Sequence, residues 1–459
     1  MNLLRSLIVM LALCGLAAHA QIPVSGGRGA GLQSIAGTDT LVTVVLKQGG
    51  AKDPNLKIVK IDGGILTVQT RTGQTTSYRV EDVAEVRVQG DTVSVKNMDL
   101  SDRVMTTDQV EIVTKALMKA TELFNASVAN QTLRMYAAEI LAVSGAASET
   151  SDDAMGGLVL PKQQAQDYLT SLVNGNDMRT AMSAALHMNN AGMEIPVVEL
   201  VPKGLASGDR LVKGSAAKLA GLTGDRSSIN DLRAMLQDRA ANIAAPATVA
   251  LANLGEKDII PSLISMVGHR NSEIADAAVY ALEKLGDEDT VAQLKMKLPD
   301  FLGTSRFRVA RVMYNLGDAE GGTILREDLL TVPSLQFEAA RVLALKGDVK
   351  GAQFLRTWLS ERRDPSETIQ KQRADATHAL IRSGDRTNAG VFQDLLREAP
   401  ASVQMLVLAR ISDLDVHSLL PMILPTLEGQ DPAVAIMAAQ TAVVMAHNDY
   451  GDRLRASRR

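Results

Sequence analysis

One phrase in the sequence has the spacing of a nucleophile and its base. Residues 215–218 read SAAK, and on a helix this SxxK phrase sets the Ser215 hydroxyl one turn from the Lys218 amine, which can activate it for acyl transfer. The SDN and KTG phrases that complete such a site do not occur in the chain. A serine and a lysine three positions apart occur about once by chance in a chain of this length. We therefore assign no catalytic residue and keep a serine hydrolase as the alternative.

Metal-binding and cofactor-binding patterns are not found. The histidines are scattered along the chain without a ligand spacing such as HExxH: His19, His187, His269, His378, His417 and His447. The acidic clusters at 287–289 and 413–415 lack the glycine and the terminal glutamate of a calcium loop. The single cysteine, Cys14, lies within the first twenty residues. We expect no metal site, no cofactor and no disulfide.

The first twenty residues have the pattern of an export signal. Arg5 precedes an apolar run over 7–16, which is too short to span a bilayer, and small residues at Ala18 and Ala20 suit signal peptidase. We expect cleavage after Ala20 and a periplasmic or secreted protein. No later apolar run is long enough to cross a membrane.

The composition excludes nucleic acid as a partner and favours helices. The chain is 46% hydrophobic, 22% charged and only 3% aromatic, with a net charge of −4. A nucleic-acid-binding protein would show a basic footprint instead. A core so poor in aromatic residues is built from Ala, Leu, Val and Met, which suits closely packed helices.

A repeat organises most of the chain. A stretch rich in Ala and Leu, then a glycine, then an acidic residue recurs, with the glycines at Gly224, Gly255, Gly286, Gly317, Gly347 and Gly384. Successive glycines are 31, 31, 31, 30 and 37 residues apart. Each period has the apolar spacing of two helices, and such hairpins bury their apolar faces only by stacking. The glycine is expected to end the second helix, and the acidic residue after it to cap the next helix.

The repeat resembles a known family. The segment 277–289, AAVYALEKLGDED, is similar to the second helix of the short bacterial HEAT repeat, VRxxAAxALGxLGD, which also occurs in phycobilisome lyase proteins. The resemblance covers roughly residues 127 to 447. It implies a right-handed α-α superhelix, a HEAT-like or armadillo-type solenoid, but no lyase activity, because many proteins without that chemistry share the repeat. In such repeats an arginine eleven positions before the glycine bonds to the acid after it, a place held here by Arg306 and Arg373. Pro246 should delay or kink its helix.

Short segments that alternate apolar and polar residues precede the helices. They lie at 41–47, 56–62, 64–71, 75–80 and 83–89, and turns separate them. Five such strands predict a small antiparallel barrel of SH3-like or Sm-like layout. An Sm-like barrel would suggest RNA binding, but Tyr78 is its only aromatic residue, so we favour a structural or protein-docking module.

The expected fold is mainly α, with a small all-β barrel before the solenoid. The expected domains are a signal peptide (1–20), a flexible linker (21–38), the barrel (39–97), a helical cap with an exposed loop (98–160), the HEAT-like solenoid (161–450) and a frayed basic tail (451–459).

One column of positions is the functional lead. Six residues before successive repeat glycines stand Lys218, Val249, Tyr280, Arg311, Arg341 and His378, which should align along the solenoid. Tyr280, Arg311, Arg341 and His378, with Arg308 nearby, would form a ridge of residue types common at protein interfaces. It is either a solvated basic face or a contact for an acidic peptide or another envelope protein. We expect an exported, non-enzymatic scaffold; the alternative is an envelope enzyme with a site between repeats or at the barrel–solenoid junction.

Overall fold

The computed structural model describes residues 41–46, 50–51, 56–62, 65–70, 73–79, 83–88, 107–143 and 160–458. The predicted signal peptide (1–20), the linker (21–38) and the loop at 146–157 lie outside these residues. The chain divides into two compact units. One contains 1–114, 146–159 and 415–424, and the other contains 115–145, 160–414 and 425–459.

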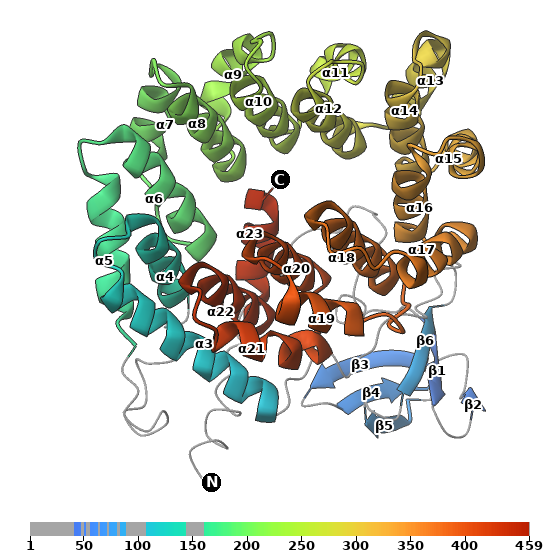
Figure 1. The fold of residues 1–459 in the computed structure, drawn as a ribbon, viewed down its shortest axis with the longest axis horizontal. Helices are drawn as coiled ribbons and strands as arrows, with labels where there is room; N and C mark the ends of the chain where they lie inside the picture. The colour runs from blue at the N-terminus through green and yellow to red at the C-terminus, as the bar shows by residue number, and fades with distance from the viewer. Residues whose placement is uncertain are drawn as a thin grey trace. The chain divides into compact units, whose positions relative to one another are not determined.

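The first unit contains an antiparallel sheet (Figure 1). Its strands are β1 (Leu41–Leu46), β2 (Gly50–Ala51), β3 (Leu56–Asp62), β4 (Ile65–Gln69), β5 (Thr75–Arg79) and β6 (Val83–Val88). The order is β2-β1-β3-β4-β5, and β6 pairs with β1. Ile58 and Val68 pair across β3 and β4 and are both buried, so one face carries the apolar residues. The predicted strands are confirmed, but the barrel is not: among the described strands no pairing joins β5 to β6 and closes the sheet.

The second unit is a helical solenoid built from hairpins. Its helices are α3 (Thr107–Ala126, which begins in the first unit), α4 (Gln131–Val143), α5 (Lys162–Val173), α6 (Met178–Ala191), α7 (Val197–Leu205), α8 (Arg210–Thr223), α9 (Ile229–Met235), α10 (Ala241–Leu254), α11 (Ile260–Met266), α12 (Ser272–Leu285), α13 (Glu288–Lys297), α14 (Thr304–Asn315), α15 (Ala319–Thr331), α16 (Gln336–Leu345), α17 (Val349–Glu361), α18 (Glu367–Arg382), α19 (Gly390–Glu398), α20 (Ala401–Leu414), α21 (Leu424–Leu427), α22 (Pro432–Ala446) and α23 (Asn448–Arg458).

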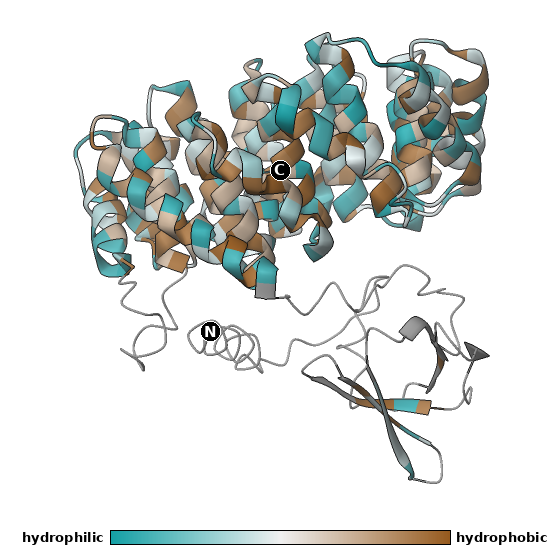
Figure 2. Cartoon of the chain, turned by 60° about the horizontal axis from the view of Figure 1, so that its bottom comes forward, coloured by the Kyte–Doolittle hydropathy of each residue, from teal (hydrophilic) through white to brown (hydrophobic). Residues whose placement is uncertain are grey.

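The second helices of the hairpins form the inner layer. In Figure 1, α6, α8, α10 and α12 lie inside α5, α7, α9 and α11, and each inner helix packs on the next. Figure 2 shows hydrophobic and hydrophilic residues interspersed along the helices of this unit, as expected for amphipathic helices.

The repeat glycines and the acids after them end and start helices as predicted. The caps are confirmed at Asp225, Asp287, Asp318 and Asp348, whose carboxylates accept backbone N–H bonds. Most repeat glycines have positive φ, but Gly286 is extended, with φ −67°. A Cβ there would lie 2.5 Å from the backbone carbonyl oxygen of Leu282, so this position needs glycine for space.

A ladder of ion pairs ties successive hairpins together. A cation of one hairpin contacts the acid that follows the next repeat glycine, in the pairs Arg226–Glu256, Lys257–Asp287, Lys295–Asp318, Arg326–Asp348 and Arg356–Asp385. Arg179 of α6 pairs with Asp209, which caps the start of the next inner helix, α8. The cations implied by the HEAT resemblance are different ones. Arg306 lies 3.6 Å from Asp328, and Arg373 donates to the carbonyls of Leu359 and Arg362, so neither forms the expected tie.

Pro246 does not interrupt its helix, because α10 runs from Ala241 to Leu254. Proline has no N–H, so Asn242 loses the bond its carbonyl would accept from residue 246. Gly214 of α8 lies directly against that carbonyl, where a side chain could not fit. The proline and the glycine together permit a close approach of α8 and α10.

The last hairpin packs on the first. Helix α22 contacts α4, and α23 contacts α6 and α8, so the run of helices in this unit closes on itself (Figure 1). The structure differs here from the expected frayed tail at 451–459. Residues 448–458 are helical, and Tyr450 and Leu454 are buried, because α23 carries apolar side chains into the closure.

A buried carboxylate holds the closure. Glu139 of α4 is fully buried and accepts bonds from His187 Nδ1 (2.5 Å), Asn190 Nδ2 (3.1 Å), Gln440 Nε2 (2.8 Å) and Tyr450 OH (2.5 Å). Burial by itself raises a carboxyl pKa, but the bond and charge of His187 and the bonds of Tyr450 and Asn190 outweigh it and lower the pKa of Glu139. A buried ionised group persists only with such a complete set of donors.

Candidate functional site

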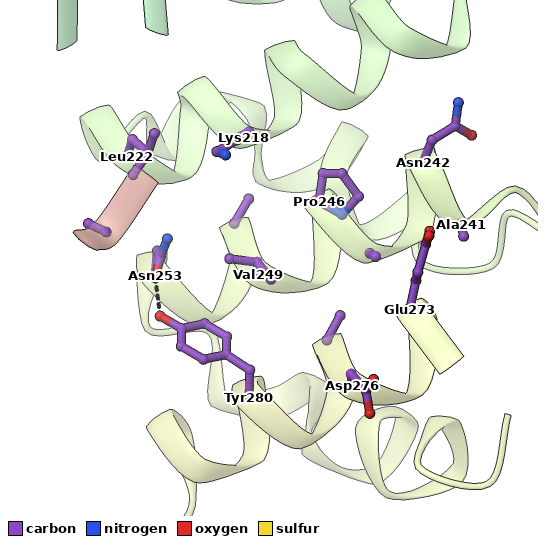
Figure 3. A pocket seen from close by; sticks show the side chains of 14 residues that line it. Lys218, Leu222, Ala241, Asn242, Pro246, Val249, Asn253, Glu273, Asp276 and Tyr280 are labelled. Carbon is purple, nitrogen blue, oxygen red and sulfur yellow. Dashed lines mark hydrogen bonds between the residues drawn. The ribbon is translucent and has the colours of Figure 1, made fainter. Parts of the chain in front are cut away.

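A pocket lies on the inner layer, where three successive inner helices pack together. It has a volume of about 570 Å³, within the usual range for ligand sites, and is lined mainly by α8, α10 and α12. Lys218, Val249 and Tyr280 face it from these three helices (Figure 3). They are equivalent positions of the repeat, six residues before each glycine. Ala456 of α23 also lines the pocket, so the closing helix contributes to its wall.

Small and apolar side chains form most of the lining. They come from all three helices: Leu222, Ala245, Pro246, Val249, Ala250 and Ala277. Alanine leaves the space that larger residues would fill. The α8 and α10 backbones also approach closely here, since a Cβ on Gly221 would lie 2.5 Å from Ala250 Cα.

Lys218 is a half-buried cation at the α8 side of the pocket. Burial lowers the pKa of its ammonium, because a charge loses solvation inside the protein. Among the described residues no carboxylate or hydrogen-bond acceptor pairs with Lys218. The ammonium is therefore available to an anionic group that enters the pocket.

Carboxylates lie at the opposite, α12 side. Glu273 and Asp276 are both exposed and line the pocket, and Glu273 extends toward Ala241 and Asn242 in Figure 3. Arg308 Nε lies 3.1 Å from Asp276 Oδ1 and neutralises much of its charge. In the described part of the chain the Glu273 carboxylate has no cationic partner. The pocket thus has a positive and a negative end.

Hydrogen bonds fix another wall of the pocket, away from Glu273 (Figure 3). Tyr280 OH donates to Asn253 Oδ1 at 3.1 Å, and Lys284 Nζ donates to the same oxygen at 2.5 Å. These bonds join α10 and α12 at the surface that a ligand would touch.

The predicted ridge is arranged differently from a free basic surface. Arg311 contacts Glu283 at 2.9 Å and Arg341 contacts Glu338 at 2.7 Å, with side chains 30% and 25% exposed. His378 is buried, and its Nε2 lies 2.8 Å from Asp413 Oδ2. Arg308 pairs with Asp276 as above. Of the five predicted residues only Tyr280 lines the pocket, and each of the other four contacts a carboxylate of this chain.

The SxxK phrase does not form a joined pair in the described residues. Lys218 lines the pocket but Ser215 does not, and no hydrogen bond joins the two. The described residues contain no group of three or more side chains able to hold a metal ion. The side chains that donate hydrogen bonds to the buried Glu139 carboxylate all lie within the packed closure of the helices. The pocket offers charge and shape for binding.

The sequence placed Lys218 in the column of positions six before the repeat glycines, but the arginines of that column were predicted to bind the partner. A signal in the sequence distinguishes them: Lys218 is followed in the next repeats by small residues, Ala245 and Ala277, whereas the arginines have acidic residues near them. Glu139 was missed because its partners are up to 311 residues away.

Comparisons with known proteins identify no family for this chain. No protein-family model and no curated protein matches the chain. Among solved structures, the complex of CpcE and CpcF of phycocyanin lyase from Nostoc sp. PCC7120 is similar at 19% identity and a TM-score of 0.35. The match covers 54% of this chain and 94% of that one. None of the described helices is long and apolar enough to cross a membrane.

Proposed function

We propose that this chain is a non-enzymatic scaffold that holds a segment of a partner protein in the pocket on α8, α10 and α12. The observation that carries the proposal is the alignment of Lys218, Val249 and Tyr280 in one partly apolar pocket, with an unpaired cation at one side. Solenoids bind extended partners along such inner surfaces, because equivalent positions of the repeats line up there.

The setting of this function rests on the sequence. We propose an exported protein whose partner lies in the cell envelope, supported by the leader pattern at 1–20. We propose that the solenoid is a right-handed HEAT-like superhelix and that the sheet belongs to an SH3-like or Sm-like docking module. The strand order, with β1 between β6 and β3, supports that module.

The ridge is proposed as a second contact that extends the pocket. Arg308 adjoins it through Asp276, while Arg311, Arg341 and His378 continue the column. An acidic segment of the partner reaches these cations only by displacing their carboxylates. The ridge therefore contributes less to affinity than the unpaired Lys218 does.

Photo-crosslinking tests the proposal. A photoreactive residue replacing Val249 in the pocket should give one discrete adduct with a native envelope protein. The same residue replacing Val198, which is 87% exposed on the outer helix α7, should not. The Lys218→Glu variant should lose most of the adduct at position 249. Equal adducts from both positions, or an adduct insensitive to Lys218, would contradict the proposal.

A further inference from the structure

We infer that the pocket takes an extended peptide segment with one acidic side chain at Lys218 and one basic side chain at Glu273, about six or seven residues apart. This rests on the proposed function and names the chemistry of the bound segment. Three features of the pocket carry it: the charge at each end, the distance between the ends and the lining between them.

The α8 side selects an anion. The Lys218 ammonium is half-buried and has no carboxylate among the described residues, unlike Arg308, Arg311 and Arg341. A carboxylate brought to it gains a charge-assisted bond in a partly desolvated place. Binding there also removes the cost of holding an unpaired charge away from water.

The α12 side selects a cation. Arg308 pairs with Asp276, but the Glu273 carboxylate beside it is unpaired in the described structure, so the local charge stays negative. A second acidic group on the ligand would be repelled, and a lysine or arginine would be attracted. A segment with opposite charges at its two ends therefore fits better than one with two like charges.

The distance between the ends fixes the spacing. Packed helices lie about 8–10 Å apart, and α8 and α12 are separated by two such steps through α10. Lys218 stands six residues before its repeat glycine and Glu273 thirteen, so the two ends are also offset by about 10 Å along the helices. The ends are thus about 19–23 Å apart. An extended chain advances about 3.3 Å per residue, so the charged residues stand about six or seven positions apart.

The lining selects the residues between the charges. Ala245, Val249 and Ala277 favour small apolar side chains. Asn242 and Asn253 add side-chain amides, which can bond to a peptide backbone.

Charge-pattern peptides test the inference on the full chain. The probes are fluorescent, end-capped peptides with Ala and Val in the middle and either glutamate and lysine, two glutamates or two lysines about six positions apart. Fluorescence anisotropy should show the wild-type chain binding the mixed peptide at least tenfold more tightly than either like-charged one. Lys218→Glu should change the preference to two lysines, and Glu273→Lys should change it to two glutamates.

Matched variants control for general charge effects. Lys213→Glu alters a lysine of the same helix outside the pocket, and Glu288→Lys alters another first-turn glutamate, on α13. Both should keep the wild-type preference. If Lys218→Glu unfolds, Lys218→Met replaces it and should weaken the mixed peptide at least tenfold without favouring two lysines.

The outcomes separate this inference from the proposed function. Indifference to charge pattern, or the same preference in all variants, overturns the inference. If the adduct at position 249 still forms and still depends on Lys218, the scaffold proposal stands without this ligand. If the charge-pattern preference and the Lys218-dependent adduct are both absent, the inference and the scaffold proposal are both overturned.

Discussion

At the scale of single residues, buried charge decides which side chains hold the fold and which are available. The Glu139 carboxylate has four donors, whereas the Lys218 ammonium has no described partner. The first arrangement stabilises the closure of the helices. The Lys218 ammonium can therefore form a favourable ion pair when an anionic ligand binds.

The first prediction concerns this buried carboxylate. Glu139→Ala should lower the free energy of unfolding by about 3 kcal/mol, because its buried donors lose a charged acceptor. Tyr450→Phe removes one donor and should cost about 1–2 kcal/mol. Urea unfolding followed by circular dichroism measures both. Two variants as stable as the wild type would show that the closure does not depend on this carboxylate.

The second prediction concerns acid stability at Asp413. Burial acts to raise the pKa of this carboxyl, but the bond and charge of His378 and the charges of Arg382 and Arg410 lower it to about 2. The folded-state value lies below the unfolded value, so the stabilisation is present above about pH 4 and is lost as the pH falls toward 2.

Asp413→Asn should therefore lose about 1–2 kcal/mol at neutral pH and show a flatter stability profile between pH 4 and 2, after allowance for screening. Unfolding free energies across this range measure the effect. Asp231→Asn, at an exposed site on α9, is the control. Parallel profiles for wild type and Asp413→Asn would rule out this contribution.

At the scale of elements, local patterns predicted the hairpins well. The glycine period and the caps at Asp287 and Asp318 depend only on nearby residues, so the sequence contains the whole signal. The continuity of α10 through Pro246 was not predictable in this way. The Asn242 carbonyl, which loses its bond from residue 246, faces Gly214 of α8, a contact between two different helices.

The third prediction tests this close helix packing. Replacing glycine by alanine inside a helix normally stabilises it by about 1 kcal/mol. Gly221→Ala should instead destabilise the protein by about 1–3 kcal/mol, because the new Cβ meets the Ala250 backbone. Gly390→Ala at the start of α19 is the matched control, since nothing lies within 4 Å of its Cβ position. Thermal unfolding should shift in opposite directions; a stabilised Gly221→Ala would refute the close approach.

At the scale of the whole molecule, the closure of the helical unit is the feature that the sequence did not reveal. Glu139 and Gln440 are 301 residues apart, and no periodic pattern links such distant positions. The expected basic tail became α23 for the same reason: its arginines suggested solvent, but its Tyr450 and Leu454 pack inside. The closure also shapes the pocket, because Ala456 of the closing helix α23 lines it.

The fourth prediction is the most direct test of the pocket as the place where the partner binds. Acetylation of Lys218 and of Lys213 on α8 is followed by mass spectrometry, in the free chain and in complex with the protein that crosslinks at position 249. The free Lys218 amine should react readily, because burial lowers its pKa and leaves more of it neutral. Complex formation should slow its acetylation at least tenfold and leave Lys213 unchanged. Equal rates at Lys218 in the free and bound chain would contradict the account.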